Sequence, residues 1–208
     1  MKQKIIYNCP SCKGEVYISH TPIAWFKGNE CLMCIAKRVF PKIFEIAPEK
    51  FQEYIYFFFE SLMEYSIFSP VEVATYLAQI VHETGELRYM TELNPTNYEG
   101  NKSLGNIKKG DGAKFIGRGA FQITGRRNYN YVSNKLGVNF IENPELLAES
   151  QYAFRSAGAF WKLKKISENV GTDYESFKQV TKKINDGYNG LEERWNYFQE
   201  LLKFIKKN

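Results

Sequence analysis

Apolar residues recur at spacings of three and four through most of the chain from about residue 40 onward, and this rhythm limits the fold more than any other feature. Such spacing places side chains on one face of a helix, which can then pack against a core. The pattern therefore predicts a mainly α-helical fold. The predicted helices cover residues 51–64, 70–85, 143–163, 172–184 and 191–207.

Two of these helices carry start signals. Ser69-Pro70-Val71-Glu72 supplies an N-cap serine, a proline at the first helical position and a glutamate that closes a capping box. Gly85 is the expected stop of that helix, because glycine readily adopts the left-handed conformation that follows helix ends. Thr172-Asp-Tyr-Glu175 predicts a second capping box.

The helical rhythm is missing between Thr91 and Arg127, where Gly, Asn, Lys and turn signals such as Asp111-Gly112 are frequent. A long irregular segment inside a compact helical domain is usually functional. We therefore expect a helical domain with a cleft built from this loop.

The same region concentrates positive charge in a chain of formal net charge +5. Such an excess fits a polyanionic partner such as nucleic acid, peptidoglycan or teichoic acid, and it also fits a solvated basic loop. Nothing in the stretch matches a nucleic-acid-binding module, so nucleic acid is not the expected partner. Against Asp111 alone, the region holds Lys102, Lys108, Lys109, Lys114, Arg118, Arg126, Arg127 and Lys135.

All four cysteines, Cys9, Cys12, Cys31 and Cys34, form two C-x-x-C pairs near the N-terminus. Two such pairs can place four thiolates in a tetrahedron around one zinc ion. Two disulfides and a redox dithiol are the alternatives, although a reducing cytosol disfavours disulfides. Because four protein ligands leave no position for an activated water, we expect a structural zinc ion.

We expect residues 1–38 to form a small zinc ribbon and residues 39–208 to form the helical domain. A segment this short needs a metal because it cannot bury a sufficient core. Residues 15–18 and 24–26 predict a β-hairpin between the cysteine pairs. Such ribbons bind nucleic acid, protein or nothing, and a protein partner is one expectation.

No apolar run reaches the roughly 18 residues that a membrane span requires, so none is expected. The N-terminal Met1-Lys-Gln-Lys-Ile-Ile-Tyr7 carries positive charge but lacks the apolar core of a signal peptide. The expectation is synthesis in a cytoplasm without export by the general secretory route.

His82-Glu83-Thr84-Gly85-Glu86 invites comparison with zinc peptidases, which need histidines four positions apart on one helix. Glu86 occupies that position, and the chain's other histidine is His20, so this interpretation fails.

A pair of carboxylates, Glu83 and Glu92, remains as the candidate for catalysis. Glu83 ends an apolar helix, which disfavours its ionised form, whereas Glu92 lies in a polar loop. Unlike environments suit an acid and a base, although two surface glutamates would give the same pattern.

A set of ordered motifs resembles glycoside hydrolase family 19 over roughly residues 70–198, and most closely its chitinase-like endolysins from phages and bacteria. Plant chitinases are richer in disulfides than this helical domain. The motifs are Ala78-Gln-Ile-Val-His-Glu-Thr-Gly85, Thr91-Glu92, Gly105-Asn106, Phe115-Ile-Gly-Arg-Gly-Ala-Phe-Gln-Ile-Thr-Gly-Arg126, Asn128-Tyr129, Asn143-Pro-Glu-Leu146, Ile184-Asn185-Asp-Gly187 and Arg194.

The resemblance implies a lysozyme-like α-helical fold and an inverting mechanism. It implies that Glu83 is the general acid, that Glu92 is the general base and that Thr124 helps to hold the attacking water. In inverting enzymes the two carboxyl groups stand about 6.5–9.5 Å apart.

The resemblance also assigns Gln122, Asn128 and Asn185 to sugar binding and places Arg194 beside the catalytic carboxylates. Each residue has an ordinary structural interpretation too. Thr124 and Gln122 could be strand residues under the loop, Asn185 a helix C-cap and Arg194 a surface charge. His82 matches a family histidine in a packing role.

The sequence departs from the family pattern at two places. Glu86 replaces a residue that is usually glycine in bacterial relatives, and a short loop after Glu92 implies an open cleft.

We expect a peptidoglycan hydrolase that serves as a lysis enzyme or a virion component and acts on the cell wall. Basic charge and the missing export signal favour peptidoglycan. The alternatives are a chitinase and a non-catalytic wall-binding or structural virion protein.

Overall fold

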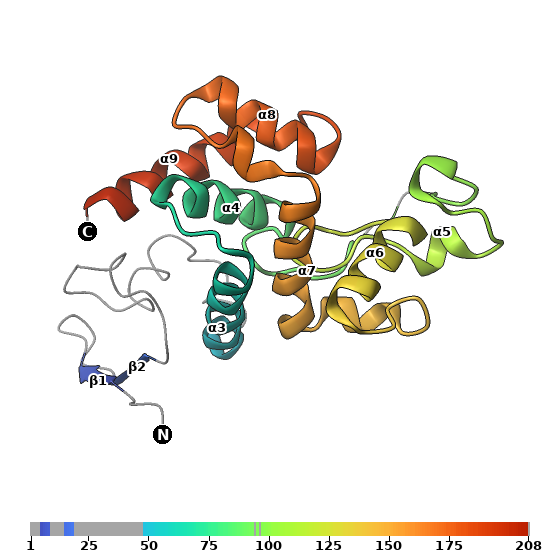
Figure 1. Ribbon diagram of the computed structural model, residues 1–208, viewed down its shortest axis with the longest axis horizontal. Coiled ribbons are helices and arrows are strands. Elements are labelled where there is room, and N and C mark those ends of the chain that lie inside the picture. The colour runs from blue at the N-terminus through green and yellow to red at the C-terminus, as the bar shows by residue number, and fades with distance from the viewer. Residues whose placement is uncertain (1–4, 9–14, 19–47, 94, 96, 208) are drawn as a thin grey trace.

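The computed structural model describes residues 5–8, 15–18, 48–93, 95 and 97–207, and these are mainly helical, as the sequence predicts (Figure 1). Within these ranges, every helix is too short or too polar to serve as a bilayer span. The longer helices are α3 (Pro48–Tyr65), α4 (Pro70–Glu83), α6 (Arg126–Leu136), α7 (Ser150–Leu163), α8 (Tyr174–Asn185) and α9 (Leu191–Lys207). The short elements are α5 (Asp111–Lys114) and the 3₁₀ turns η2 (Lys102–Leu104), η3 (Pro144–Ala148) and η4 (Ile166–Asn169).

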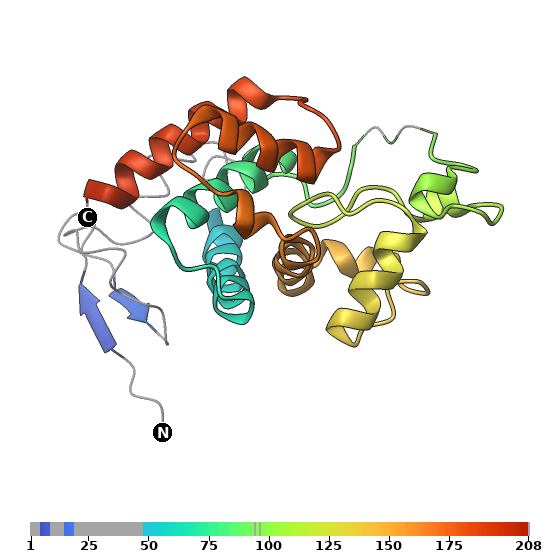
Figure 2. The same cartoon turned by 45° about the horizontal axis from the view of Figure 1, so that its top comes forward.

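The core is built on two helix pairs, α4 against α9 and α3 against α7 (Figure 1, Figure 2). Fully buried Tyr76 of α4 joins the pairs, its ring centroid 5.9 Å from that of Phe58 in α3 and 5.2 Å from that of Trp161 in α7. Phe121, from the irregular segment, packs on the same ring at 5.2 Å. Because aromatic rings bury large apolar areas, this cluster anchors the loop to the helices.

The start of α4 follows the sequence prediction only in part. Ser69 is the N-cap and its hydroxyl accepts a hydrogen bond from the backbone N–H of Glu72 at 3.1 Å. The Glu72 side chain turns inward instead of closing the box, and its Oε1 accepts hydrogen bonds from Trp161 Nε1 at 3.1 Å and from Ser167 Oγ. A buried indole N–H needs an acceptor, and this requirement outweighs a second cap contact.

Three other boundaries differ from the sequence prediction. The predicted helix over 143–163 is interrupted at Glu149, whose φ of −68° and ψ of 140° are extended, so η3 and α7 are separate. Asp173, one residue after the predicted cap, is the N-cap of α8 and accepts from Ser176 N at 2.9 Å. Helix α6 was not predicted, because its polar sequence buries only Tyr129 and Val132.

Residues 91–125 are largely irregular, as predicted, and internal contacts fix their course. Arg118 forms isolated β-bridges with Thr91 and with Ile123. Asp111, predicted only as part of a turn, is 1% exposed in α5 and pairs with Arg126 Nε at 2.8 Å and Nη2 at 2.5 Å. The hydrogen bonds from Arg126 lower the pKa of Asp111 to about 2. This bidentate ion pair ties α5 to the start of α6.

The described N-terminal residues form an antiparallel pair of strands, β1 (Ile5–Asn8) and β2 (Glu15–Ile18), with Ile5 opposite Ile18. The predicted strand at 15–18 is confirmed. Its partner among the described residues is β1, whereas the predicted partner at 24–26 lies outside them. The four cysteines also lie outside the described residues, so the zinc site and the boundary at residue 38 stay predictions.

Candidate active site

A cleft of about 540 Å³ lies where the C-terminal ends of α4 and α8 meet the irregular segment. Six side chains predicted from the sequence as site residues line it together: Glu83, Glu92, Gln122, Thr124, Asn128 and Asn185. Apolar parts of the wall come from Tyr89, Leu93, Phe121, Phe160 and Ile184. Residues separated by more than a hundred positions in sequence therefore share one cavity.

Glu83 is the last residue of α4 and contacts a buried cation. Arg194 Nη2 of α9 donates to Glu83 Oε1 at 2.7 Å, and the Arg194 side chain is 1% exposed against 15% for Glu83. Arg194 is thus not a surface charge. The carboxylate at the end of this apolar helix therefore lies beside a buried guanidinium, as the resemblance implies for Arg194.

Glu92 follows an isolated β-bridge and is held at both carboxylate oxygens. Tyr98 Oη donates to Oε1 at 2.9 Å, and the backbone N–H of Gly117 donates to Oε2 at 3.0 Å. The backbone N–H of Glu92 in turn donates to the Gly117 carbonyl at 2.9 Å. These contacts fix the orientation of the carboxylate at the cleft wall.

Gly117 makes room for three oxygen atoms that converge on it. A Cβ atom at this position would lie 2.9 Å from Gln122 Oε1, 3.1 Å from Glu92 Oε2 and 3.3 Å from Thr124 Oγ1. Even a methyl group would displace side chains here, because real Cβ contacts are rarely this short. The glycine therefore allows an acidic, an amide and a hydroxyl oxygen to gather at one place.

Thr124 and Gln122 lie in the turn after Gly119. The Thr124 hydroxyl donates to the Gln122 carbonyl at 2.8 Å, which leaves the lone pairs of Thr124 Oγ1 as acceptors. Gln122 has a φ of +47°, and its Nε2 donates to the Gly119 carbonyl at 3.1 Å. The strand interpretation therefore fails for Gln122, whose backbone is left-handed.

Two asparagines that line the cleft, Asn128 and Asn185, use their amide N–H groups internally. Asn128, in the first turn of α6, donates from Nδ2 to the Thr124 carbonyl at 2.8 Å. Asn185 is the last residue of α8 and donates to the Asn189 carbonyl at 3.4 Å, whereas the C-cap is Asp186. Internal donation fixes both amides in the wall.

His82 and Glu86 flank Glu83 in sequence but do not line the cleft. His82 Nδ1 lies 2.7 Å from Glu193 Oε2, and burial followed by the charge of Arg194 lowers the pKa of His82. Glu86 is 7% exposed and accepts a hydrogen bond from Tyr197 Oη at 3.1 Å. His82 thus packs against α9, and Glu86 does not line the cleft that holds Glu83 and Glu92.

Sequence reasoning did not identify Tyr98 and Gly117, which contact Glu92, or Gln79, which accepts a hydrogen bond from Arg194 at 2.8 Å. The glycine stands within a quoted motif, but its role depends on side chains that meet only after folding. Tyr98 lies in an irregular loop, where no periodicity signals a function. Gln79 precedes Glu83 by one helical turn, and that spacing was an available signal.

The model for glycosyl hydrolase family 19, described as chitinase class I, matches residues 69–173. A Haemophilus influenzae protein named glycosyl hydrolase family 19 domain-containing protein is 35% identical over 98 residues, which cover 47% of this chain and 46% of that protein. Endochitinase A of Zea mays is 33% identical over 91 residues, covering 43% and 32% of the two chains.

The chain therefore matches less than half of the length of these curated relatives. Among solved structures, chitinase C from Streptomyces griseus HUT6037 aligns with a TM-score of 0.63 and 22% identity, over 84% of this chain and 91% of that one. At this identity the likeness concerns the fold, and it agrees with the helical architecture described above.

Proposed function

The chain belongs to glycoside hydrolase family 19, and on this premise we propose that it hydrolyses peptidoglycan, cutting β-1,4 bonds between amino sugars with inversion. One observation carries the proposal: Glu83 and Glu92 line the same cleft but have unlike partners. A buried guanidinium contacts Glu83, whereas a phenol and a backbone N–H contact Glu92. Such a division suits one acid and one base.

Glu83 would protonate the glycosidic oxygen as the bond to the anomeric carbon breaks. The carboxylate that remains then lies 2.7 Å from Arg194, whose charge stabilises it. General acid catalysis of this kind contributes roughly 10²–10⁴-fold.

Glu92 would accept a proton from the water that attacks the opposite face of the sugar. A water placed between Glu92 and Thr124 could donate one hydrogen to each, because the Thr124 hydroxyl already donates its own proton to Gln122. The water's lone pair would then face the anomeric carbon. One proton leaves Glu83 and one reaches Glu92, and exchange with solvent restores both groups before the next cycle.

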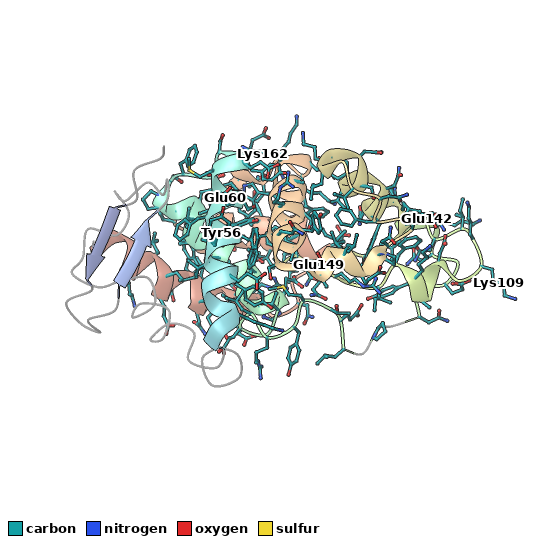
Figure 3. All side chains as sticks on the ribbon, turned by 90° about the horizontal axis from the view of Figure 1, so that it is seen from below. Tyr56, Glu60, Lys109, Glu142, Glu149 and Lys162 are labelled. Carbon is teal, nitrogen blue, oxygen red and sulfur yellow. The ribbon has the colours of Figure 1, made fainter. Side chains whose placement is uncertain are left out.

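Peptidoglycan is the proposed substrate because its peptide stems and attached polymers carry negative charge, whereas chitin is neutral. Lys102, Lys108, Lys109 and Arg127 are exposed around η2 and α5, while Asp111 of the same region is buried against Arg126. Figure 3 shows Lys109 at the outer tip of this loop. The region therefore presents cations outward beside the part of the cleft that contains Tyr98 and Leu104.

Chitin hydrolysis is the second candidate, favoured by the printed names of relatives such as endochitinase A. Both polymers contain β-1,4-linked N-acetylated sugars, so the catalytic pair serves either. The test compares clearing of purified bacterial walls with release of reducing sugars from colloidal chitin at equal enzyme concentration. Faster turnover of walls, with loss of that advantage at high salt, supports the proposal. Activity on chitin alone would identify chitin, and not peptidoglycan, as the substrate.

We further propose that Cys9, Cys12, Cys31 and Cys34 hold one structural zinc ion in a ribbon that docks to a protein partner. Their thiolate set suits zinc, and the strands β1 and β2 lie on either side of the connection that contains Cys9 and Cys12. The enzyme would act on the wall after release from a host cytoplasm or as part of a virion.

A further inference from the structure

The guanidinium that contacts Glu83 is held from a second side by Gln79. Arg194 Nη1 donates to Gln79 Oε1 at 2.8 Å, and Arg194 Nε donates to the Asn189 carbonyl at 3.1 Å. Gln79 is 0% exposed and stands one turn before Glu83 on α4. Two neighbouring positions of one helix therefore accept hydrogen bonds from the same arginine.

The orientation of the Gln79 amide follows from a hydroxyl on α8. Thr181 Oγ1 donates to the Phe177 carbonyl at 3.1 Å, so its single proton is used there and only lone pairs face Gln79. Gln79 Nε2 donates to Thr181 Oγ1 at 2.9 Å. The amide N–H group must therefore face Thr181, and its carbonyl oxygen must face Arg194.

We propose that Gln79, oriented by Thr181, is a positioning residue for the general acid, acting through Arg194. The inference rests on the proposed role of Glu83. The chain of contacts runs from the Phe177 carbonyl through Thr181, Gln79 and Arg194 to Glu83, and all three intermediate side chains are buried. Neither Gln79 nor Thr181 lines the cleft, so neither binds substrate directly.

The network holds the Arg194 guanidinium beside Glu83, on which negative charge would appear during proton transfer. If Gln79 lost its carbonyl, a buried N–H of Arg194 would lack its acceptor, and the guanidinium would turn toward another one. Glu83 would then hold its proton more tightly and become a weaker acid. We expect a lower kcat where Glu83 is fully protonated, an unchanged KM and an alkaline limb of the pH profile that moves to higher pH.

Thr181→Val tests the chain because it keeps the side-chain shape and removes the acceptor, whereas Thr181→Ser keeps the acceptor. Thr75→Val is the matched control: Thr75 is also buried in a helix, and its hydroxyl donates to the Val71 carbonyl four residues earlier at 2.7 Å. Gln79→Met removes the carbonyl directly at similar length. Circular dichroism establishes that each variant is folded.

The main measurement is the ¹³C NMR titration of Glu83 in the full chain with labelled glutamate, its signal assigned by its disappearance in Glu83→Gln. The midpoint should rise by about one pH unit in Thr181→Val and Gln79→Met and stay unchanged in Thr181→Ser and Thr75→Val. Kinetics on solubilised wall glycan should show a fall of up to about tenfold in the plateau that kcat reaches at low pH, where Glu83 is fully protonated, for the first two variants only.

An unchanged Glu83 midpoint in folded Thr181→Val overturns the inference, and this variant decides the question if Gln79→Met unfolds. Equal shifts in Thr75→Val would also overturn it, because any buried hydroxyl would then serve. If the Glu83 midpoint shifts in the variants but the unmodified protein cleaves no amino-sugar glycan, the positioning network is retained and the proposed function is rejected. The two proposals can therefore fail separately.

Discussion

Arg194 Nη2 of α9 lies 2.7 Å from Glu83 Oε1 at the end of α4, and this ion pair connects the helix core to the cleft. The contact places a buried positive charge beside the residue that we propose as the proton donor. A carboxylate formed there by proton transfer would have its counter-charge already in place.

Glu83→Gln should abolish wall hydrolysis and leave the fold intact, because the amide has no acidic proton yet still accepts a hydrogen bond from Arg194. The expected loss is at least about 10²-fold. Turbidity clearing and thermal unfolding measure the two effects. Glu86→Gln is the control, since Glu86 lies outside the cleft, and it should retain activity. If Glu83→Gln kept more than about a tenth of wild-type activity, Glu83 would not be the general acid.

Glu92→Ala should hydrolyse slowly and be partly rescued by azide, because a small anion can replace the activated water. In the unmodified protein, proton NMR of the fresh reducing end should show the α-anomer first. Direct attack by water on a β-linked sugar gives this outcome. A β-anomer formed first would mean retention, and Glu92 would then lose its role as the base that activates water.

Gly117→Ala should reduce activity by about 10²-fold with a smaller effect on stability, because the new methyl group displaces the oxygens of Glu92, Thr124 and Gln122. Gly187→Ala is the control: its nearest contact would be at 3.8 Å, and its φ is not in the left-handed region. Initial rates on walls and thermal melts of both variants provide the comparison. Equal activity in the two variants would show that the space at Gly117 has no catalytic importance.

Asp111→Asn should lower the free energy of unfolding by about 3 kcal/mol, because it leaves Arg126 without its buried anion. The pKa of Asp111 falls to about 2 in the folded protein, below the ordinary value of 3.8. The ion pair's contribution is therefore present above pH 3.8 and is lost as pH falls through about 2. Denaturation midpoints measured against pH should show this acid loss, and Asp111→Asn should lack it. Exposed Asp186→Asn should behave as the unmodified protein.

Metal analysis of protein purified without chelators should find one zinc per chain. Chelation should alter the N-terminal segment and spare the helical circular dichroism, because the helical domain contains no cysteine. Cys31→Ser should reduce metal content in the same way. An absence of stoichiometric metal would disprove the site, and loss of all helical signal on chelation would disprove the independence of the two parts.

Local sequence signals predict the features that depend on interactions between residues close in the chain, such as helix starts and stops. The capping serine at Ser69, the stop near Gly85 and the stripe of the final helix are all found in the structure, since each depends on neighbours within one or two turns. The same reasoning misplaced the start of α8 and joined η3 to α7. Those boundaries depend on a competing cap and on one extended residue, which the apolar spacing does not report.

The sequence alone determined that the chain is mainly helical and that an irregular segment after Thr91 interrupts the helices, and it predicted unlike surroundings for Glu83 and Glu92. Only the tertiary structure decided what those surroundings are. Arg194 stands 111 positions from Glu83, and Gly117 stands 25 positions from Glu92, yet each touches its carboxylate. Packing of α9 on α4 and folding of the irregular segment bring these residues together. Contacts between elements that meet only in the folded protein leave no periodic pattern in the sequence.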